Sequence, residues 1–457
     1  MKLRTIEYRC VMYAFLSLFL LMASSSLFAQ EGKTYYWVGK SEMSKDWTEI
    51  DNWSDSPDGP GGLAGNIEDA PTSENTVIFD ELSHSDTIII SDKVRCNDLE
   101  VLNVGGSGEA PTFQFDNSEA RIEISGSLLF HKTVYLLFPK NNLDCQFLHF
   151  VNADKDKIGK IKTSGTVMGK KIYYSLYGYQ MDNSGSGTAP LQGTMVFNAG
   201  NEDVKWELVD ALTTPRLLVK KGILDLKTFA LTTMIVEATG GQMVFPNNKN
   251  ITCALNWKYN TEGEALKSPV ATNSKIRIHG GHFNGRKEDT YHDVEFYGSS
   301  SAHLIDKGKF NTITFKAGKA YQIGVHEEGA LITKNLIIES GSEFRFAYIT
   351  IENEFRAKPA VDGGQVWLRA FDNSPYSVRE ARIIMGSNNV NVERAVINDL
   401  NIEGSMSYEA KNSYNWGNNS GWTYTNPAAG RSLYWIGGNG KWNNPANWTS
   451  NSNGTPD

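Results

Sequence analysis

The chain has 457 residues, 40% of them hydrophobic, with 44 Lys and Arg against 52 Asp and Glu and a formal net charge of −8. Acidic and basic residues are interleaved without a basic block, which argues against nucleic acid and anionic membrane surfaces as partners. Beyond the N-terminal leader no stretch is apolar enough to predict a membrane-spanning helix.

The N-terminus has the layout of a secretory signal peptide. Three basic residues precede an apolar run from Val11 to Met22, and small residues follow as far as Ala29. The apolar run is too short for a comfortable membrane span. We therefore predict a signal peptide over residues 1–29 and a mature protein at the outer cell surface or outside the cell.

A Trp-rich phrase opens the mature chain and recurs near its end. In both copies the third Trp lies six positions after the second (53 − 47 and 448 − 442). We interpret this recurrence as one module followed by the start of another in a longer tandem array. The two copies are Tyr36-Trp37-Val38-Gly39 with Trp47 and Asn52-Trp53-Ser54, and Tyr434-Trp435-Ile436-Gly437 with Trp442 and Asn447-Trp448-Thr449. The predicted divisions are a Trp-rich N-terminal cap (30–74), a repeat module (75–425), a linker (426–433) and the start of a second module (434–457).

Strand signals dominate the body of the chain. Short β-branched and aromatic runs are cut by Gly, Asn, Asp and Ser, and long helical periodicity is scarce. The clearest predicted strands are Thr76 to Phe79, Thr87 to Ile90, Arg121 to Ile124, Lys275 to Ile278, Thr312 to Phe315 and Leu336 to Ile338. We therefore expect an all-β fold.

A six-residue phrase recurs within these strands: an apolar residue or Thr, two mostly polar residues, then apolar, any, apolar. Three successive copies start 19 and 23 residues apart (310 − 291 and 333 − 310), the length of one solenoid coil. The copies begin at Cys96, Tyr291, Phe310, Thr333 and Ile397, with a looser one at Cys145. The spacing predicts a parallel β-solenoid, a right-handed β-helix with Trp-rich end caps. Tandem β-sandwiches are the alternative.

The solenoid prediction assigns a direction to individual side chains. Leu99 and Val101 should point into one long core, as should Ile313 and Phe315, while Glu100 and Thr314 should face outward. The Asn-Asp pair before a strand suits a corner, because these residues tolerate left-handed backbone. About thirteen coils fit between Cys96 and Ile397, which gives a rod on the order of 60 Å long. Residues 183–187 are predicted to be a loop leaving the coil.

The sequence favours structural roles for the cysteines and tryptophans. The mature chain has three Cys, an odd number, so we expect buried thiols and not a disulfide framework, with Cys96 and Cys145 at one equivalent position. Eight of the eleven Trp lie in the opening and closing phrases, where they suit plugs for the open ends of a solenoid. The alternative is an aromatic platform for glycans. These residues are Trp37, Trp47, Trp53, Trp416, Trp422, Trp435, Trp442 and Trp448.

The residues that could carry chemistry form no recognisable catalytic set. Asp98, Asp293 and Asp399 come nearest to a shared stack, yet a corner role explains each. His279 and His282 lack obvious further metal ligands besides His292. We predict no catalytic residues, cofactor or metal site, apart from weak Ca²⁺ binding at acidic loops, at Glu68-Asp69 and at residues 55–58.

The opening phrase, the following segment from Ala70 to Asp80, and the closing Gly417 to Trp422 resemble modules of very large repetitive cell-surface proteins of Bacteroidetes-type bacteria. That class includes gliding-motility adhesins exported by the type IX secretion system. The resemblance implies a β-helical stalk or adhesive module on the outer surface, without enzymatic activity. Its partners would be surface glycans, other cells or substrata, and the secretion machinery.

The expected function is therefore that of an exported structural and adhesive module without catalysis. A β-helix enzyme acting on polysaccharides, or a glycan-binding protein, is the alternative. A pure spacer that holds a distal domain away from the membrane is a third interpretation.

Overall fold

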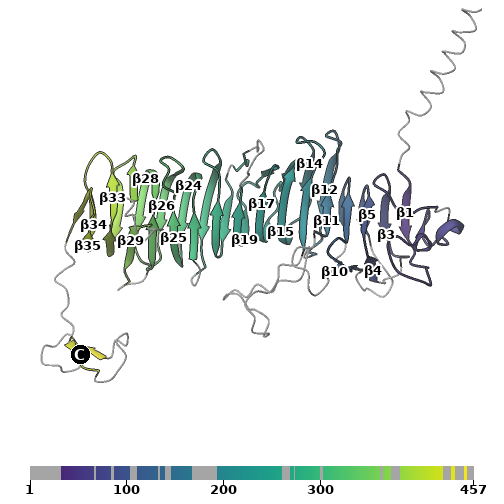
Figure 1. Ribbon diagram of the computed structural model, residues 1–457, viewed down its shortest axis with the longest axis horizontal. Coiled ribbons are helices and arrows are strands. Elements are labelled where there is room, and N and C mark those ends of the chain that lie inside the picture. Colours follow the sequence, from purple (N-terminus) through teal and green to yellow (C-terminus); the bar gives the residue numbers. More distant parts are fainter. Residues whose placement is uncertain are drawn as a thin grey trace, which may run out of the picture.

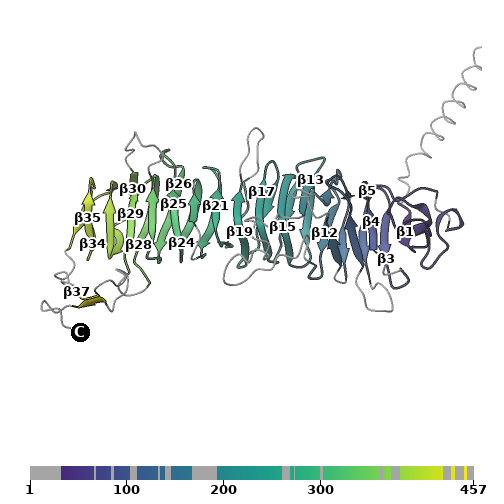
Figure 2. The same cartoon turned by 60° about the horizontal axis from the view of Figure 1, so that its bottom comes forward.

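A computed structural model describes most of the chain as a rod of stacked β-strands (Figures 1 and 2). Within the described residues there is no α-helix, and two 3₁₀ turns are present, η1 (Ile50–Asn52) and η2 (Gly62–Gly65). The predicted leader, the linker and the 183–187 loop lie outside the described residues. The described ranges are 32–65, 68–83, 87–102, 111–131, 134–138, 146–166, 193–259, 268–271, 273–298, 302–360, 364–371, 381–425, 434–437 and 447–449.

The strands fall into three sheets along the rod and one short separate pair. In spatial order, one sheet comprises β18 (Gln242–Val244), β16 (Ile223–Asp225), β14 (Lys205–Leu208), β12 (Ile158–Lys162), β9 (Leu128–Phe130), β6 (Leu99–Val101), β3 (Thr76–Phe79), β1 (Thr34–Trp37) and β2 (Trp53–Ser54). A second sheet comprises β10 (Tyr135–Leu137), β7 (Thr112–Phe115) and β4 (Thr87–Ile90). The separate pair is β37 (Tyr434–Trp435) and β38 (Trp448–Thr449).

The third sheet system runs the length of the rod and holds all the remaining strands. Its members are β5 (Lys93–Cys96), β8 (Arg121–Ile124), β11 (Leu148–Phe150), β13 (Thr194–Asn198), β15 (Leu212–Lys221), β17 (Leu231–Ala238), β19 (Asn250–Lys258), β20 (Lys275–Ile278), β21 (Gly281–Asn284), β22 (Thr290–Phe296), β23 (Ala302–Ile305), β24 (Gly308–Phe315), β25 (Lys319–Ile323), β26 (Leu331–Ile338), β27 (Glu343–Phe346), β28 (Tyr348–Ala357), β29 (Val366–Ala370), β30 (Ala381–Met385), β31 (Asn389–Glu393), β32 (Ala395–Asn398), β33 (Leu400–Glu403), β34 (Tyr408–Lys411), β35 (Tyr414–Gly417) and β36 (Trp422–Tyr424).

Neighbouring coils stack in parallel, so the predicted solenoid is confirmed. Apart from the short pairs β1–β2 and β37–β38, every pairing between the strands named above is parallel. Long strands bend around corners and join two faces: the start of β19 pairs with β20, and its end pairs with β21. All six of the clearest predicted strands are present, four of them with the predicted bounds.

The recurring phrase is confirmed in the middle of the rod. Val294 pairs with Ile313, and Ile313 pairs with Leu336, at the predicted separations of 19 and 23 residues (313 − 294 and 336 − 313). The same column continues with Phe355 and then Val390. Equivalent residues of successive coils therefore lie above one another.

Other copies of the phrase lie on other faces, which corrects the prediction that Cys96 and Cys145 occupy one equivalent position. Leu400 pairs with Ala381 and so does not continue the Leu336 column. Cys96 pairs with Ile124, which pairs with Phe150, so the structural equivalent of Cys96 is not Cys145. Cys145 itself lies outside the described residues. A corner followed by apolar-any-apolar serves every face of a solenoid, so the phrase does not identify which face a copy occupies.

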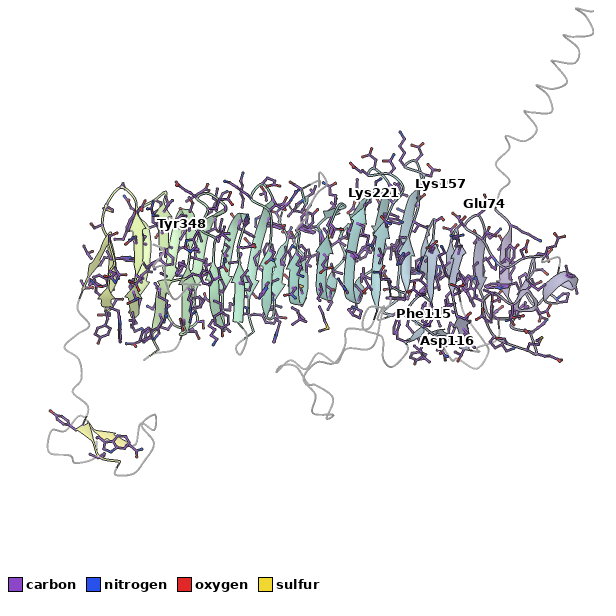
Figure 3. All side chains as sticks on the ribbon, in the orientation of Figure 1. Glu74, Phe115, Asp116, Lys157, Lys221 and Tyr348 are labelled. Atoms are coloured by element: carbon purple, nitrogen blue, oxygen red, sulfur yellow. The ribbon has the colours of Figure 1, made fainter. Side chains whose placement is uncertain are left out.

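Side-chain directions follow the period of two that a strand requires. Leu99, Val101, Ile313 and Phe315 are all fully buried, as predicted, and the residues between them face outward. Cys96 and Cys253 are free, buried thiols. Charged side chains project along both long edges of the rod, with Lys157 and Lys221 on one edge and Asp116 on the opposite edge (Figure 3).

The first coil begins earlier than the predicted boundary at residue 75. β1 pairs in parallel with β3, with Tyr35 opposite Val77, so the cap segment itself contributes a solenoid strand. β2 then lies antiparallel on the outer edge of β1, with Trp37 opposite Trp53. An antiparallel strand at this edge ends the parallel stack and covers what would otherwise be an open edge.

The second copy of the opening phrase adopts the same local pairing. Trp435 lies opposite Trp448, as Trp37 lies opposite Trp53. A 2.8 Å hydrogen bond from the backbone N–H of Ile436 to the carbonyl of Asn447 matches the 2.8 Å bond between the corresponding residues of the first copy. This agreement supports the interpretation of residue 434 as the start of a second copy.

Candidate functional site

The three Trp of the opening phrase are buried in the N-terminal end of the rod. Trp37, Trp47 and Trp53 are 0% exposed, and their rings lie about Phe79 of β3. The ring centroid of Trp53 is 5.0 Å from that of Trp37 and 4.9 Å from that of Trp47. The indole N–H of Trp53 donates to the carbonyl of Trp47 at 2.7 Å. In this conformation none of the three rings offers a face to a ligand.

This N-terminal cluster is also fastened to the neighbouring sheet through the backbone. The N–H of Trp47 donates to the carbonyl of Ile89 in β4, and the N–H of Ile89 donates to the carbonyl of Lys45, each at 2.9 Å. Asn52 is fully buried, and its side chain bonds the backbone of Ser41, Ser44 and Asp46. The segment thus has the contacts that a structural cap requires.

The aromatic residues at the C-terminal end behave differently, contrary to the expectation that both ends are plugged alike. Trp422 is half-buried and donates its indole N–H to the carbonyl of Leu400 at 3.0 Å. Trp416, in contrast, is 66% exposed, and Trp435 is 36% exposed. Trp442 and the side chain of Trp448 lie outside the described part of the chain.

Trp416 belongs to a continuous outer surface built by five adjacent strands. β25, β27, β29, β32 and β35 pair in that order, and the labels of β25, β29 and β35 lie in one row in Figure 1. Alternate residues of each strand fill the core, so the others share the outer face. We call this surface the aromatic face; its members are Lys319, Tyr321, Glu343, Arg345, Trp367, Arg369, Val396, Asn398, Tyr414 and Trp416.

Four aromatic rings of this face are accessible. Tyr321 is 45% exposed, Trp367 36%, Tyr414 46% and Trp416 66%. The rings of Trp367 and Trp416 lie 5.5 Å apart with an interplanar angle of 53°. Val396, between them in the strand order, faces outward by register and yet is only 4% exposed, because neighbouring side chains cover it.

A β-bulge sets the position of Trp416. Ile397 pairs with Asn415 and Asn398 pairs with Gly417, which leaves Trp416 as the extra residue of β35. A bulge of this kind re-aims a side chain at the edge of a sheet. Gly417 follows with φ 126°, a backbone conformation that favours glycine. The local sequence therefore turns an indole toward solvent at the end of the rod.

A small charged network adjoins the rings. Glu343 Oε1 accepts from Arg345 Nε at 2.7 Å and lies 3.3 Å from Arg369 Nη1. The Arg345 guanidinium lies 5.6 Å from the ring centre of Tyr321, and Lys319 Nζ lies 5.0 Å from the same ring centre. In the register of the sheet Glu343 is opposite Trp367. Three cations and one carboxylate thus border the aromatic rings.

The acidic residues that came nearest to a shared stack are not brought together. Asp98 accepts from the backbone N–H of Ser127 at 2.6 Å, and Asp293 accepts from the Asn311 side chain at 3.0 Å. Asp399 has φ 53° and so occupies the left-handed corner that we predicted for this residue type. The three lie on well-separated coils, and each has a structural partner.

The predicted weak cation sites have no clustered ligands either. No group of three or more His, Cys, Asp and Glu residues is placed to hold a metal ion in the ranges that the structure describes. His279 lies against the ring of Tyr297 at 5.3 Å, while His282 is exposed. Asp58 pairs with Lys40 at 3.5 Å. Weak Ca²⁺ binding at these loops stays a prediction.

No family model matches the chain, and neither does any curated protein or solved structure. None of the helical segments within the described ranges is long and apolar enough to cross a membrane. Functional reasoning therefore depends on the residues themselves, and the aromatic face brings four exposed aromatic rings onto one sheet.

Proposed function

We propose that the chain is a non-catalytic structural and adhesive module of an exported cell-surface protein, and that the aromatic face is its contact surface for glycans. The observation that carries the proposal is the presence of four exposed rings on one face of a parallel sheet, two of which, those of Trp367 and Trp416, lie 5.5 Å apart. Single exposed apolar residues are ordinary, whereas several exposed rings gathered on one sheet face are typical of a binding surface.

The chemistry of the rings fits carbohydrate better than protein. An indole face carries partial negative potential and attracts the polarised C–H groups of a pyranose ring, which lie on one side of the sugar. β29 is hydrogen-bonded on both sides, to β27 and to β32, so the backbone beneath Trp367 has little freedom to lose on binding. β35, which carries Trp416, pairs with β32. Export and surface placement are supported by the leader-like N-terminus and by the recurring Trp phrase.

A glycan array tests this function directly. The purified protein should bind at least one class of surface polysaccharide, and Trp367→Ala with Trp416→Ala should abolish the binding without changing the melting temperature. Tyr135→Ala is the matched control, because Tyr135 is 60% exposed on β10 in another sheet. Release of reducing ends from the bound polysaccharide would favour the alternative of a polysaccharide-active enzyme. Absence of binding to any glycan would favour a pure spacer.

A further inference from the structure

We propose that the aromatic face selects acidic glycans, with Trp367 and Trp416 stacking on sugar rings while Arg345 and Arg369 pair with a carboxylate or sulfate of the same chain. This inference rests on the proposed function, since it names the ligand class of the same surface. It depends on a separate observation, namely the charge that borders the rings.

The charge of this face is opposite to that of the whole molecule. Lys319, Arg345 and Arg369 oppose Glu343, so the outward positions of the five strands carry +2 (3 − 1), while the chain carries −8. A local positive surface on an acidic protein attracts anions within about one Debye length, roughly 8–10 Å at physiological salt. The aromatic face thus combines exposed rings with a local positive charge.

The two guanidinium groups keep hydrogen-bonding capacity for a ligand. The contacts to Glu343 involve Nε of Arg345 and Nη1 of Arg369, and a guanidinium has five N–H donors. The Arg369 side chain is 44% exposed and that of Arg345 is 29% exposed. Guanidinium groups bind planar or tetrahedral oxyanions through paired hydrogen bonds, which a neutral sugar does not offer.

The strand geometry places rings and charges at a suitable separation. Trp367 and Arg369 are alternate residues of β29 on the same face, about 6.6 Å apart along the strand. Glu343 lies opposite Trp367, and Arg345 lies opposite Arg369. A sugar stacked on the indole therefore presents a ring substituent toward the pair of arginines, which matches a uronic acid or a sulfated hexose.

Single-stranded nucleic acid is the other polymer with ring faces and negative charges, and the charge count disfavours it. Nucleic-acid affinity comes from many phosphate contacts. The aromatic face has three cations, and its one carboxylate, Glu343, pairs with two of them, so few cations remain for phosphate contacts. An acidic glycan with spaced charges is the better match.

The test compares each glycan with a partner that differs only in charge. The probes are oligogalacturonate against its methyl ester, and dextran sulfate against dextran, titrated by calorimetry at low and physiological salt. We expect the acidic member to bind at least about tenfold more tightly, and Arg369→Gln to remove most of that preference. The carboxylated and sulfated pairs together identify which acid group is preferred.

The N-terminal part of the rod offers a matched control for the arginine variant. Glu123 accepts from Arg95 and from Arg121, each at 3.1 Å, the same arrangement of two arginines on one glutamate without neighbouring exposed Trp. Arg95→Gln should leave glycan binding unchanged. Equal binding of the charged and neutral members, lost in Trp367→Ala, would overturn the acidic-glycan inference and leave the proposed function standing. Tighter binding of a thymidine oligonucleotide than of either acidic glycan would also overturn it.

Discussion

Removing the indole of Trp53 should loosen the N-terminal end of the rod and leave the rest intact. The side chain is fully buried, its ring contacts those of Trp37, Trp47 and Phe79, and its N–H is bonded. Truncation of a buried Trp to Ala costs about 3–5 kcal/mol. A coil of a solenoid contacts only its neighbours, so this loss should be felt in the first coils and fade along the rod.

Hydrogen exchange followed by mass spectrometry measures that locality. A free-energy change of about 1.4 kcal/mol corresponds to a factor of ten in the opening equilibrium. A loss of about 4 kcal/mol in the local opening free energy therefore accelerates exchange roughly a thousandfold for amides that exchange only when this region opens. We expect this in peptides covering β1 and β3 of Trp53→Ala, and little change in peptides covering β26 and β28. Trp416→Ala is the control: its ring is 66% exposed, so the change should stay within about 0.5 kcal/mol. Unchanged exchange in β1 and β3, or uniform acceleration along the rod, would refute the reasoning.

Three further predictions concern the core. Ile313→Ala should lower the free energy of unfolding by about 2–5 kcal/mol in urea titrations, whereas Thr314→Ala on the outer face should change it by less than about 0.5 kcal/mol; similar losses would contradict the assigned directions. Burial lowers the pKa of His303 to about 4, so the unfolded chain binds a proton that the folded chain does not, and stability should fall as pH drops from about 6.5 to 4. The thermal midpoint across that range should slope less in His303→Phe, and an identical slope would contradict this. The thiols of Cys96 and Cys253 should resist iodoacetamide at pH 8 until the protein unfolds, because burial raises both pKa values; mass spectrometry of the native protein checks this, and labelling without unfolding would contradict it.

The coil repeat could be predicted from the sequence because each stacked position makes the same demand. Val294, Ile313 and Leu336 are apolar at matching places in the phrase, and they do lie in one column. The face on which a copy of the six-residue phrase lies depends on the number of residues in the corners between strands. That number varies from coil to coil. Leu400 therefore carries the right pattern on a different column.

The candidate site was harder to predict because burial depends on what covers a residue. The opening and closing phrases are both rich in Trp, but Trp53 has Phe79 beside it, whereas Trp416 is the extra residue of a bulge. Trp367 stands alone in the sequence, 49 residues before Trp416 (416 − 367), and only the pairing of β29, β32 and β35 brings the two rings together. The sequence likewise does not mark Tyr321, Arg345 and Arg369 as members of a site, because each has the pattern of an ordinary outward-facing strand residue.

The direction of the hydrogen bonds between coils has a mechanical consequence. Because β1 and β35 lie at opposite ends of the rod, tension applied between them runs along the inter-coil bonds and opens one ladder at a time instead of shearing many together. Each coil of roughly 20 residues adds about 4.8 Å to the folded length but releases about 70 Å of extended chain when it unravels. A load would therefore unfold the rod in steps. In each step the extended chain released is roughly fifteen times as long as the folded coil that it replaces.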